Sequence, residues 1–340
     1  MTTHSTAQRR LAAGLVLRGY AGPTDADEMA RVQNASNEDA GVDERVSAEG
    51  LANRLAFPSH RSDPAQDGVV ARVGDLVVGW GSIDWYDTTD GLREYQTRGS
   101  VHPDWQGRGI GSAILAHNEA RIRRVAAGHP DDRPRVFGSW ASERRPSSMA
   151  LITRAGYRPV RYFFDMLRPT LDDVEVPPLP GGIEVRPVDE ARLRQLFDAD
   201  AEAFADHWGG FDASADAFAQ WLADPDFDPS LLVVGWHGDE VAGGVTNLIK
   251  ARENEELGIK RGLLASVFVR RPWRRRGLAA ALVARSLVLL RDRGMTSAWL
   301  GVDADNPNGA LGVYERAGFA VHTRATAYRK PLDKEPGRER

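Results

Sequence analysis

Cysteine is absent from this 340-residue chain. Its absence excludes disulfide bonds, thiolate metal sites and a cysteine nucleophile, and it fits a reducing compartment. Lysine is scarce, since only four of the 44 basic residues are lysines (250, 260, 330 and 334), and the net charge of −4 lacks the basic excess of a nucleic-acid-binding protein. No apolar run approaches the roughly 18 residues that a membrane helix requires. We therefore expect a cytoplasmic protein without a nucleic-acid or membrane partner.

One segment near the N-terminus has some features of a targeting signal. Arg9-Arg10 precedes the largely apolar stretch Leu11–Leu17, as in a twin-arginine signal. The stretch is short, however, Arg18 ends it, and no small-residue cleavage site follows. We interpret the stretch as a first β-strand that follows a polar tail.

Three sequence patterns occur twice, in the same order and at similar spacing. A Gly-Asp turn between two apolar runs, typical of a β-hairpin, occurs at residues 74–75 and 238–239. A segment rich in Arg and Gly occurs at 101–111 and 269–279, and Arg-Ala-Gly precedes Tyr157 and Phe319. The chain therefore contains a duplicated domain. The Pro- and Gly-rich stretch 174–182 is typical of a linker, so we expect domains at 1–173 and 183–340, the second with a short polar tail.

Hydrophobic periodicity predicts the same order of elements in both halves. Each half begins with a strand and a helical region and continues through the hairpin and a further strand into the Arg- and Gly-rich turn. A helix, a strand, a helix and a last strand follow. Asn306 before Pro307 predicts where the last helix begins. The expected fold class is α/β, with two tandem domains that each have a mixed, mainly antiparallel central sheet and helices on both faces.

The Arg- and Gly-rich turn has the features of an anion site. Glycine lets a ligand approach the backbone closely, and the first N–H groups of the following helix are unpaired at its positive end. Arg274, Arg275 and Arg276 add charge in the second copy, and Gln106 with Arg108 is a weaker version in the first. Neither copy fits the lysine-containing phosphate loop or the dinucleotide fingerprint. We expect the turn to bind a pyrophosphate; helix capping with solvated arginines is the alternative.

The motif that carries this turn resembles the acetyl-CoA pyrophosphate loop of the GNAT superfamily of N-acetyltransferases. It occurs as Gln106-x-x-Gly109-x-Gly111 and as Arg274-x-x-Gly277-x-Ala279, and residues 306–319 are similar to the superfamily's other hallmark segment. The resemblance covers nearly the whole chain, once in each half. It implies two tandem GNAT-like domains and acetyl-CoA as co-substrate. The cofactor-binding residues that it implies are Val267, Phe268, Val269, Arg274, Arg275, Arg276, Gly277, Leu278, Ala279 and Asn308, and, in the first half, Val101, Gln106, Gly107, Arg108, Gly109, Ile110 and Gly111.

The resemblance also implies a mechanism. An amine would attack acetyl-CoA directly in a ternary complex, and the backbone N–H near Val269 would polarise the thioester carbonyl. Tyr314 matches the family tyrosine that protonates the departing thiolate; a buried core aromatic is the alternative interpretation. The first half has Ile152 at the equivalent position. We therefore expect the second half to be catalytic, and the first to be structural or to bind CoA without turnover.

The residue that deprotonates the acceptor is open. Some relatives carry an acidic residue at the position of Ala265, which cannot serve as a base here. The candidate bases elsewhere in the chain are Glu202, Asp206, His207, Glu253, Glu255 and Glu256, and a water molecule could also carry the proton. The acceptor should meet residues 201–228, which contain aromatic side chains beside carboxylates that could receive a cationic amine. An amphipathic helical pair is the alternative reading of that region. Our preferred acceptor-binding residues are Asp206, His207 and Trp208. No metal site is expected, because the histidines are scattered.

The function we expect is therefore N-acetylation of a primary amine of a small molecule or peptide. Two alternatives stay open: an acyltransferase that uses another acyl-CoA or an O-acceptor, and a non-catalytic acyl-CoA sensor. The sequence is compatible with a monomer or a homodimer.

Overall fold

The computed structural model describes residues 11–56, 63–205, 207–208, 212–306 and 309–332. The elements of the first half are β1 (Leu15–Gly19), α1 (Pro23–Asp39), α2 (Ala48–Ala56), α3 (Pro64–Asp67), β2 (Gly68–Val73), β3 (Leu76–Asp87), β4 (Arg93–Val101), α4 (Ile110–Ala127), β5 (Arg135–Ser142), α5 (Pro146–Arg154) and β6 (Arg158–Arg168). Those of the second are β7 (Glu184–Val185), α6 (Leu193–Phe204), α7 (Ala215–Leu222), β8 (Leu232–His237), β9 (Glu240–Leu248), α8 (Ala251–Leu257), β10 (Arg261–Val269), α9 (Leu278–Asp292), β11 (Ser297–Asp303), α10 (Ala310–Arg316) and β12 (Ala320–Pro331).

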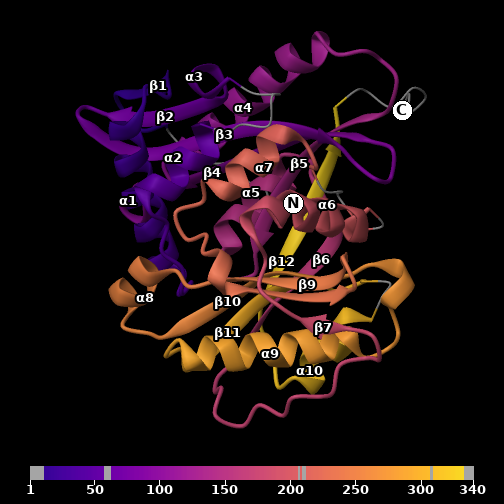
Figure 1. Cartoon of the computed structure of the whole chain (residues 1–340). Coiled ribbons are helices and arrows are strands. Elements are labelled where there is room, and N and C mark those ends of the chain that lie inside the picture. Colours follow the sequence, from indigo (N-terminus) through magenta and orange to yellow (C-terminus); the bar gives the residue numbers. More distant parts are fainter. Residues whose placement is uncertain (1–10, 57–62, 206, 209–211, 307–308, 333–340) are drawn as a thin grey trace, which may run out of the picture.

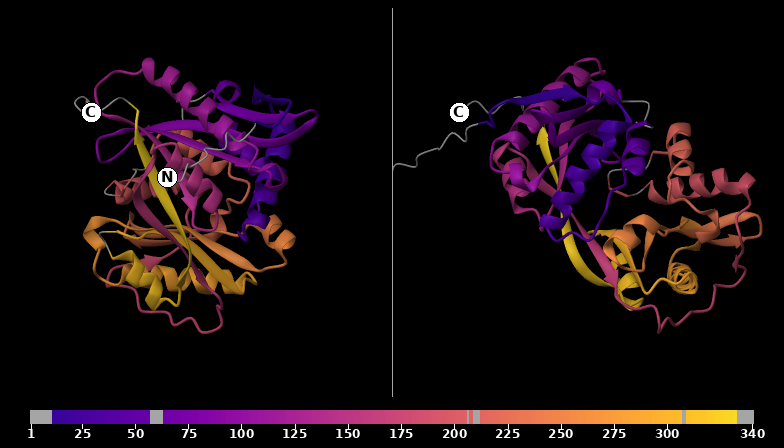
Figure 2. Two further views of the ribbon diagram at one scale, coloured as in Figure 1. Left: turned by 180° about the vertical axis from the view of Figure 1, so that it is seen from behind. Right: turned by 90° about the vertical axis from the view of Figure 1, so that its left-hand side faces the viewer.

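The described strands form one continuous mixed sheet in which the two halves exchange their last strands. The order is β1-β2-β3-β4-β5-β12-β6-β11-β10-β9-β8-β7. β12, from the second half, pairs with β5 of the first, and β6, from the first half, pairs with β11 of the second. The long β12 can be followed from one half into the other in Figures 1 and 2. Each half is therefore completed by a strand of the other.

Helices cover both faces of the sheet, as the sequence predicts. In the second half, α9 and α10 pack on one face and α6 and α7 on the other. In the first half, α4 and α5 pack on one face and α1 and α2 on the opposite face. Adjacent residues of β2 point to opposite faces, because Val69 packs with α4 while Val70 packs with α1 and α2. The two tandem domains of the expected fold class are thus present.

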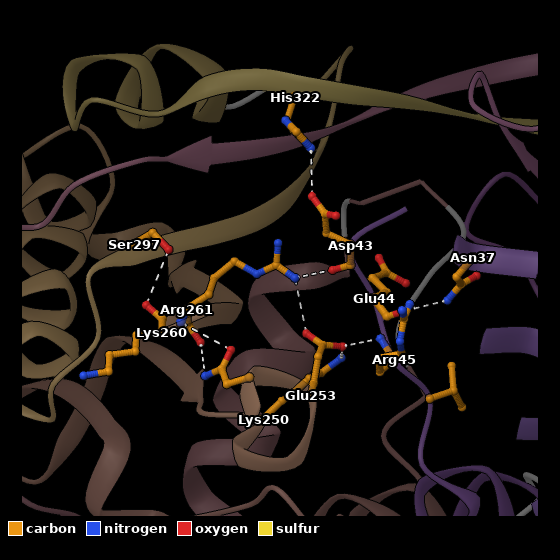
Figure 3. Close-up of polar contacts among 12 residues, drawn as sticks. Asn37, Asp43, Glu44, Arg45, Lys250, Glu253, Lys260, Arg261, Ser297 and His322 are labelled. Carbon is orange, nitrogen blue, oxygen red and sulfur yellow. Dashed lines mark hydrogen bonds and ion pairs between the residues drawn. The ribbon is translucent and has the colours of Figure 1, made fainter. Parts of the chain in front are cut away.

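The halves also contact each other through equivalent connections. The segment that follows α1 reaches α8, where the backbone N–H of Arg45 donates to Glu253 at 2.9 Å. The Arg261 guanidinium donates to the carbonyl of Asp43 and pairs with Glu253 at 3.3 Å (Figure 3). The second half makes a similar contact with the first. The hydroxyl of Thr89 donates a hydrogen bond to the carbonyl of His207, in the segment after α6. Each half therefore places the loop after its first long helix against the connection β3–β4 or β9–β10 of the other half.

One predicted helix start is wrong. The sequence places it at Asn306-Pro307, but α10 begins at Ala310, and the left-handed Gly309 (φ 70°) occupies the cap position. The carbonyl of Asn306 instead accepts the N–H of Gly309. Pro307 and the predicted cofactor-binding Asn308 lie outside the described residues. No helix in the described part of the chain is long and apolar enough to cross a membrane.

Candidate active site

The second Arg- and Gly-rich turn joins the end of β10 to the N-terminus of α9. A short 3-10 turn, Arg271–Trp273, leads into it, and Gly277 (φ 83°) precedes the first residue of α9. Arg275 adopts φ 61°, a left-handed conformation that non-glycine residues rarely occupy. No side chain of the described residues caps α9, so the N–H groups of Leu278 and Ala279 lie in the uncapped first turn at its positive end.

The three arginines of this turn have different surroundings. Arg274 donates to the carbonyls of Val269 (2.9 Å) and Ala203 (3.0 Å) and thereby fastens the turn to β10 and α6. Arg275 and Arg276 are exposed and make no hydrogen bond or ion pair with other described residues. The structure therefore leaves two guanidinium groups available beside the uncapped N-terminus of α9, while Arg274 holds the turn in place.

The first copy of the turn has the same geometry with less charge. Gly107 (φ 73°) takes the position of Arg275, and Gly109 (φ 79°) precedes Ile110 and Gly111 of the uncapped α4. The Gln106 amide lies 3.5 Å from the carbonyl of Val101, as Arg274 lies near that of Val269. Arg108 stacks over Trp105, and its carbonyl accepts the N–H of Ala12. The N-terminal segment thus lies against the first turn.

The two halves differ in the strand that precedes the turn. β10 has a bulge at Ala265, because Leu264 pairs with Asn247 and Ser266 already pairs with Thr246. Within the described range 63–205, β3 and β4 pair without any register shift. A bulge adds one residue to a strand, which bends and twists it locally. The bulge therefore distinguishes the second half from the first independently of side-chain identity.

Both halves open where two parallel strands separate. β10 and β11 pair from Arg261↔Ser297 to Leu263↔Trp299 and then diverge. Arg270 N donates to the carbonyl of Ala242, and alternate residues of an antiparallel pair face opposite edges. The N–H groups of Val267 and Val269 therefore point to the side of β10 where β11 no longer pairs with it. The N–H of Phe268 points towards β9.

Tyr314 lies on α10 within the core of the second half. It is 6 % exposed and packs with the cluster that contains Trp273 and Leu278 of the turn and helix. Burial raises the pKa of its hydroxyl. Its carbonyl accepts the N–H of Phe319 at 3.0 Å, and in the first half the carbonyl of Ile152 accepts the N–H of Tyr157 at 3.1 Å. The structural equivalence of Tyr314 and Ile152 follows from these matching bonds.

A cleft of about 1400 Å³ opens in the first half, which the sequence presents as non-catalytic. It runs from the first turn, at Gln106 and Gly109, along the separating strands β4 and β5. At its far side it reaches Gln220 of α7 and Ala325 of β12, which belong to the second half. The first half therefore keeps an open cleft although it lacks both the bulge and the tyrosine.

The predicted acceptor-binding residues lie at the contact between the halves. Trp208 packs against Trp140 and Phe163, with ring centroids 6.2 and 5.9 Å apart, and Arg329 lies 4.5 Å above it. The His207 ring lies 4.2 Å from that of Phe204. Because Phe163 pairs with Asp303, this aromatic cluster adjoins the C-terminal end of β11. Asp206 lies outside the described residues.

The candidate carboxylates differ in their partners. Glu202 pairs with Arg270 at 2.7 Å, Glu256 pairs with Arg252, and Glu253 is buried among Arg261, Lys250 and the N–H of Arg45. A carboxylate that the sequence reasoning missed lies nearer the bulge: Asp200 bonds Ser266. The helical spacing of Leu193, Leu196, Phe197 and Phe204 places residue 200 on the apolar face, and this could have identified it. In the described part of the chain no cluster of His, Asp and Glu could hold a metal ion.

Comparison with known proteins identifies the family. The profile of the acetyltransferase (GNAT) family matches residues 192–319, and the profile of the acetyltransferase (GNAT) domain matches residues 64–158. The chain belongs to the GNAT family and is an N-acetyltransferase with two tandem GNAT domains.

The curated relatives include enzymes named mycothiol acetyltransferase. That of Salinispora arenicola is 30% identical over 273 residues, which are 76% of this chain and 79% of the relative. That of Parafrankia sp. is 28% identical over 310 residues, 85% of this chain and 91% of the relative.

Solved structures share the fold over almost the whole chain. A GCN5-related N-acetyltransferase from Sphaerobacter thermophilus superposes with a TM-score of 0.70 at 26% identity and covers 95% of this chain and 98% of its own. A tandem GNAT protein from the clavulanic acid biosynthesis pathway gives 0.68 at 17% identity, with 94% and 99% covered. The arrangement of two GNAT domains in one chain is therefore shared with solved structures.

Proposed function

We propose that the second half transfers the acetyl group of acetyl-CoA to a primary amine of a small molecule or peptide by direct attack in a ternary complex. The observation that carries the proposal is the bulge at Ala265, beyond which β10 and β11 diverge, in the half that also has Tyr314. A strand that leaves its partner exposes backbone N–H groups to a bound thioester. The first half lacks this combination of features.

The second half provides a group for each step of the transfer. The pyrophosphate binds the N–H groups of Leu278 and Ala279 and the guanidinium groups of Arg275 and Arg276. The thioester oxygen accepts the N–H of Val269 as negative charge develops on it. The amine nitrogen bonds to the carbonyl carbon, the C–S bond breaks, and Tyr314 protonates the thiolate. The proton that the nitrogen loses on becoming an amide then returns to the Tyr314 oxygen, which restores the hydroxyl. Tyrosine has an ordinary pKa of about 10, and burial raises the pKa of Tyr314 further, so its hydroxyl carries the proton that it would donate.

The acceptor is proposed to bind beside the aromatic cluster around Trp208. His207 and Trp208 follow α6 and adjoin the end of β11, where an amine would meet the acetyl group. Arg329 occupies one surface of Trp208, so the acceptor would contact the part of the aromatic cluster that Arg329 leaves uncovered. Because relatives of this chain are named for mycothiol, mycothiol without its acetyl group is the first acceptor to test.

We propose further that the first half binds CoA without turnover. Its cleft of about 1400 Å³ begins at an intact turn, whereas Ile152 has no proton to donate. Calorimetry with acetyl-CoA should then show two binding events per chain. One event that persists when Gly109 is replaced by Val would restrict CoA to the second half. The cytoplasmic location stays a prediction, as does the expectation that the protein is either a monomer or a homodimer.

A screen of acceptors tests the proposed function. Purified protein is incubated with acetyl-CoA, or with a longer acyl-CoA, and with a panel of primary amines and alcohols that includes deacetylated mycothiol. Free CoA and the acetylated product are both separated by chromatography and quantified by mass spectrometry. Acetylated amine formed with one CoA released per transfer supports the proposal. Transfer only from a longer acyl-CoA, or only to a hydroxyl, would establish the alternative acyltransferase. Binding of acetyl-CoA without any transfer would indicate the sensor.

A further inference from the structure

Asp200 is a buried carboxylate on the face of α6 that packs against the sheet. It is 8 % exposed and shares this face with Leu196 and Ala203. Its Oδ1 accepts a hydrogen bond from Ser266 Oγ at 2.9 Å. Burial raises the pKa of Asp200 to about 7, and the bond from Ser266 opposes this only in part. Burying a carboxylate without a cation costs stability, so its retention in this core needs an explanation.

Ser266 is the residue that follows the bulge, and the bulge determines where its side chain points. Leu264 and Val267 both pack on the α9 side of the sheet although they are three residues apart. The extra residue, Ala265, reverses the alternation, so Ser266 and Phe268 face α6. Ala265 is exposed and Ser266 only partly buried, although β10 is a central strand. The Ser266 hydroxyl therefore lies at the accessible edge of the site, with Asp200 behind it.

The charged side chains near Asp200 make hydrogen bonds or ion pairs with residues other than Asp200. Glu202, one half-turn along α6, pairs with Arg270, and Arg274 bonds the carbonyls of Val269 and Ala203. On β9, the residue paired with Ser266 is the uncharged Thr246. On α7, which packs on the same helix, Phe218 and Trp221 face α6, and the acidic residue of α7 is Asp216. No cation pairs with Asp200 among the residues that the structure describes, so nothing there neutralises it.

We propose that Asp200 and Ser266 form a proton-accepting pair for the acceptor amine of the second half. This proposal rests on the proposed function and adds the base to it. The ammonium group of the acceptor donates to Ser266 Oγ. One proton passes from nitrogen to Ser266 Oγ as the serine proton passes to Asp200, which leaves a neutral amine and a protonated carboxyl. The amine then attacks the thioester, and Asp200 returns its proton to solvent after the product leaves.

The pair fits this task better than the other carboxylates do. Glu202 and Glu253 are each paired with an arginine, so both carboxylates already have a cationic partner. Glu253 also lies near Arg261, at the start of β10, whereas Ser266 adjoins the bulge. A base works best when its pKa lies near the working pH. Asp200 meets that condition because of its burial, and Ser266 links it to the site.

The test compares Asp200→Asn and Ser266→Ala with Asp198→Asn as a control, because Asp198 is an exposed carboxylate on the same helix, paired with Arg194. Each protein is assayed with acetyl-CoA and two amines. One is the best alkylamine from the acceptor screen, protonated at neutral pH because its pKa lies near 10. The other is methoxyamine, which is neutral at that pH and needs no base before attack.

Asp200→Asn should lower kcat/KM for the alkylamine by about 10²- to 10⁴-fold. It should also move the acidic limb of the pH profile from about 7 towards the pKa of the amine. With methoxyamine the loss should be within about fivefold, and the KM for acetyl-CoA should not change. Ser266→Ala should show the same selectivity, and it keeps the test valid if Asp200→Asn fails to fold.

Two results would overturn the pair while the proposed function stands. The first is an unchanged acidic limb in Asp200→Asn, and the second is an equal loss with both amines, which would indicate a structural role. A wild-type protein that transfers acetyl to neither amine, nor to any acceptor in the screen, would overturn the proposed function and this proposal together.

Discussion

The exchanged strand β12 is held in the first half by a buried ion pair, and removing its arginine should destabilise the protein strongly. Arg329 Nε lies 2.6 Å from Glu94 Oε2, and the two side chains are 10 % and 1 % exposed. Arg329 also pairs with the partly exposed Asp90. Breaking a buried pair by removing one partner costs about 3 to 5 kcal/mol, because the other charge stays buried, while an exposed pair contributes about 0 to 1 kcal/mol. Arg329→Ala should therefore lower the free energy of unfolding by about 3 kcal/mol or more at neutral pH.

The loss should depend on pH. Burial raises the pKa of Glu94, and Arg329 opposes this, so without Arg329 the pKa of Glu94 in the folded protein rises further. The folded state then binds a proton that the unfolded state has released. Stability consequently falls as the pH rises from the unfolded pKa of about 4.3 towards neutrality. The difference between Arg329→Ala and the wild type should be larger at pH 7.5 than at pH 5.

Urea unfolding followed by tryptophan fluorescence at both pH values measures this difference. Arg324→Ala is the matched control, since Arg324 is an exposed arginine on the same strand, and it should cost less than about 1 kcal/mol. Adding Glu94→Gln to Arg329→Ala removes the buried charge and should restore part of the loss. A double variant no more stable than Arg329→Ala at pH 7.5, or a loss that does not change with pH, would refute the reasoning.

Two further predictions concern the site. Replacing both Arg275 and Arg276 with Gln should raise the KM for acetyl-CoA about tenfold, equivalent to ~1.4 kcal/mol, with kcat nearly unchanged. Steady-state kinetics measure this change. The control is Arg291→Gln, which changes a partly exposed arginine at the other end of α9 and should leave KM unaltered. Trp208→Ala removes the ring that contacts Phe163 and Arg329. It should raise the KM for the amine severalfold and leave the KM for acetyl-CoA unchanged. An increased KM for acetyl-CoA with an unchanged KM for the amine would show that the acceptor does not bind at Trp208.

The repeated motifs predicted the two-domain fold because each pattern has a local cause. Gly74 (φ 57°) and Gly238 (φ 59°) adopt the left-handed conformation that a tight hairpin needs. The exchange of β6 and β12 could not be predicted, because the sequence of a strand specifies which face is apolar but not which strand pairs with its edge. Strand pairing between distant segments depends on tertiary contacts.

The sequence predicted those features of the candidate site that depend on neighbouring residues, and it did not predict those that join distant segments. The position of the turn, its uncapped helix and the equivalence of Ile152 and Tyr314 follow from motifs that are local in sequence. The role of Arg274 as a fastening to two carbonyls, and the bond from Ser266 to Asp200, join segments that are far apart in sequence. A bulge likewise depends on the partner strand, so Ala265 gave no local signal.

The measurement that tests the account most directly is the initial rate of CoA release, with the best acceptor amine, by Tyr314→Phe. Tyr157→Phe is the matched control, because Tyr157 is a buried tyrosine at the corresponding end of the first half. Loss of a proton donor costs about 10²- to 10⁴-fold, so the account predicts a fall of at least about 100-fold in kcat for Tyr314→Phe, with acetyl-CoA binding intact and Tyr157→Phe near the wild-type rate. A wild-type rate in Tyr314→Phe, or a comparable loss in Tyr157→Phe, would contradict the assignment of catalysis to the second half.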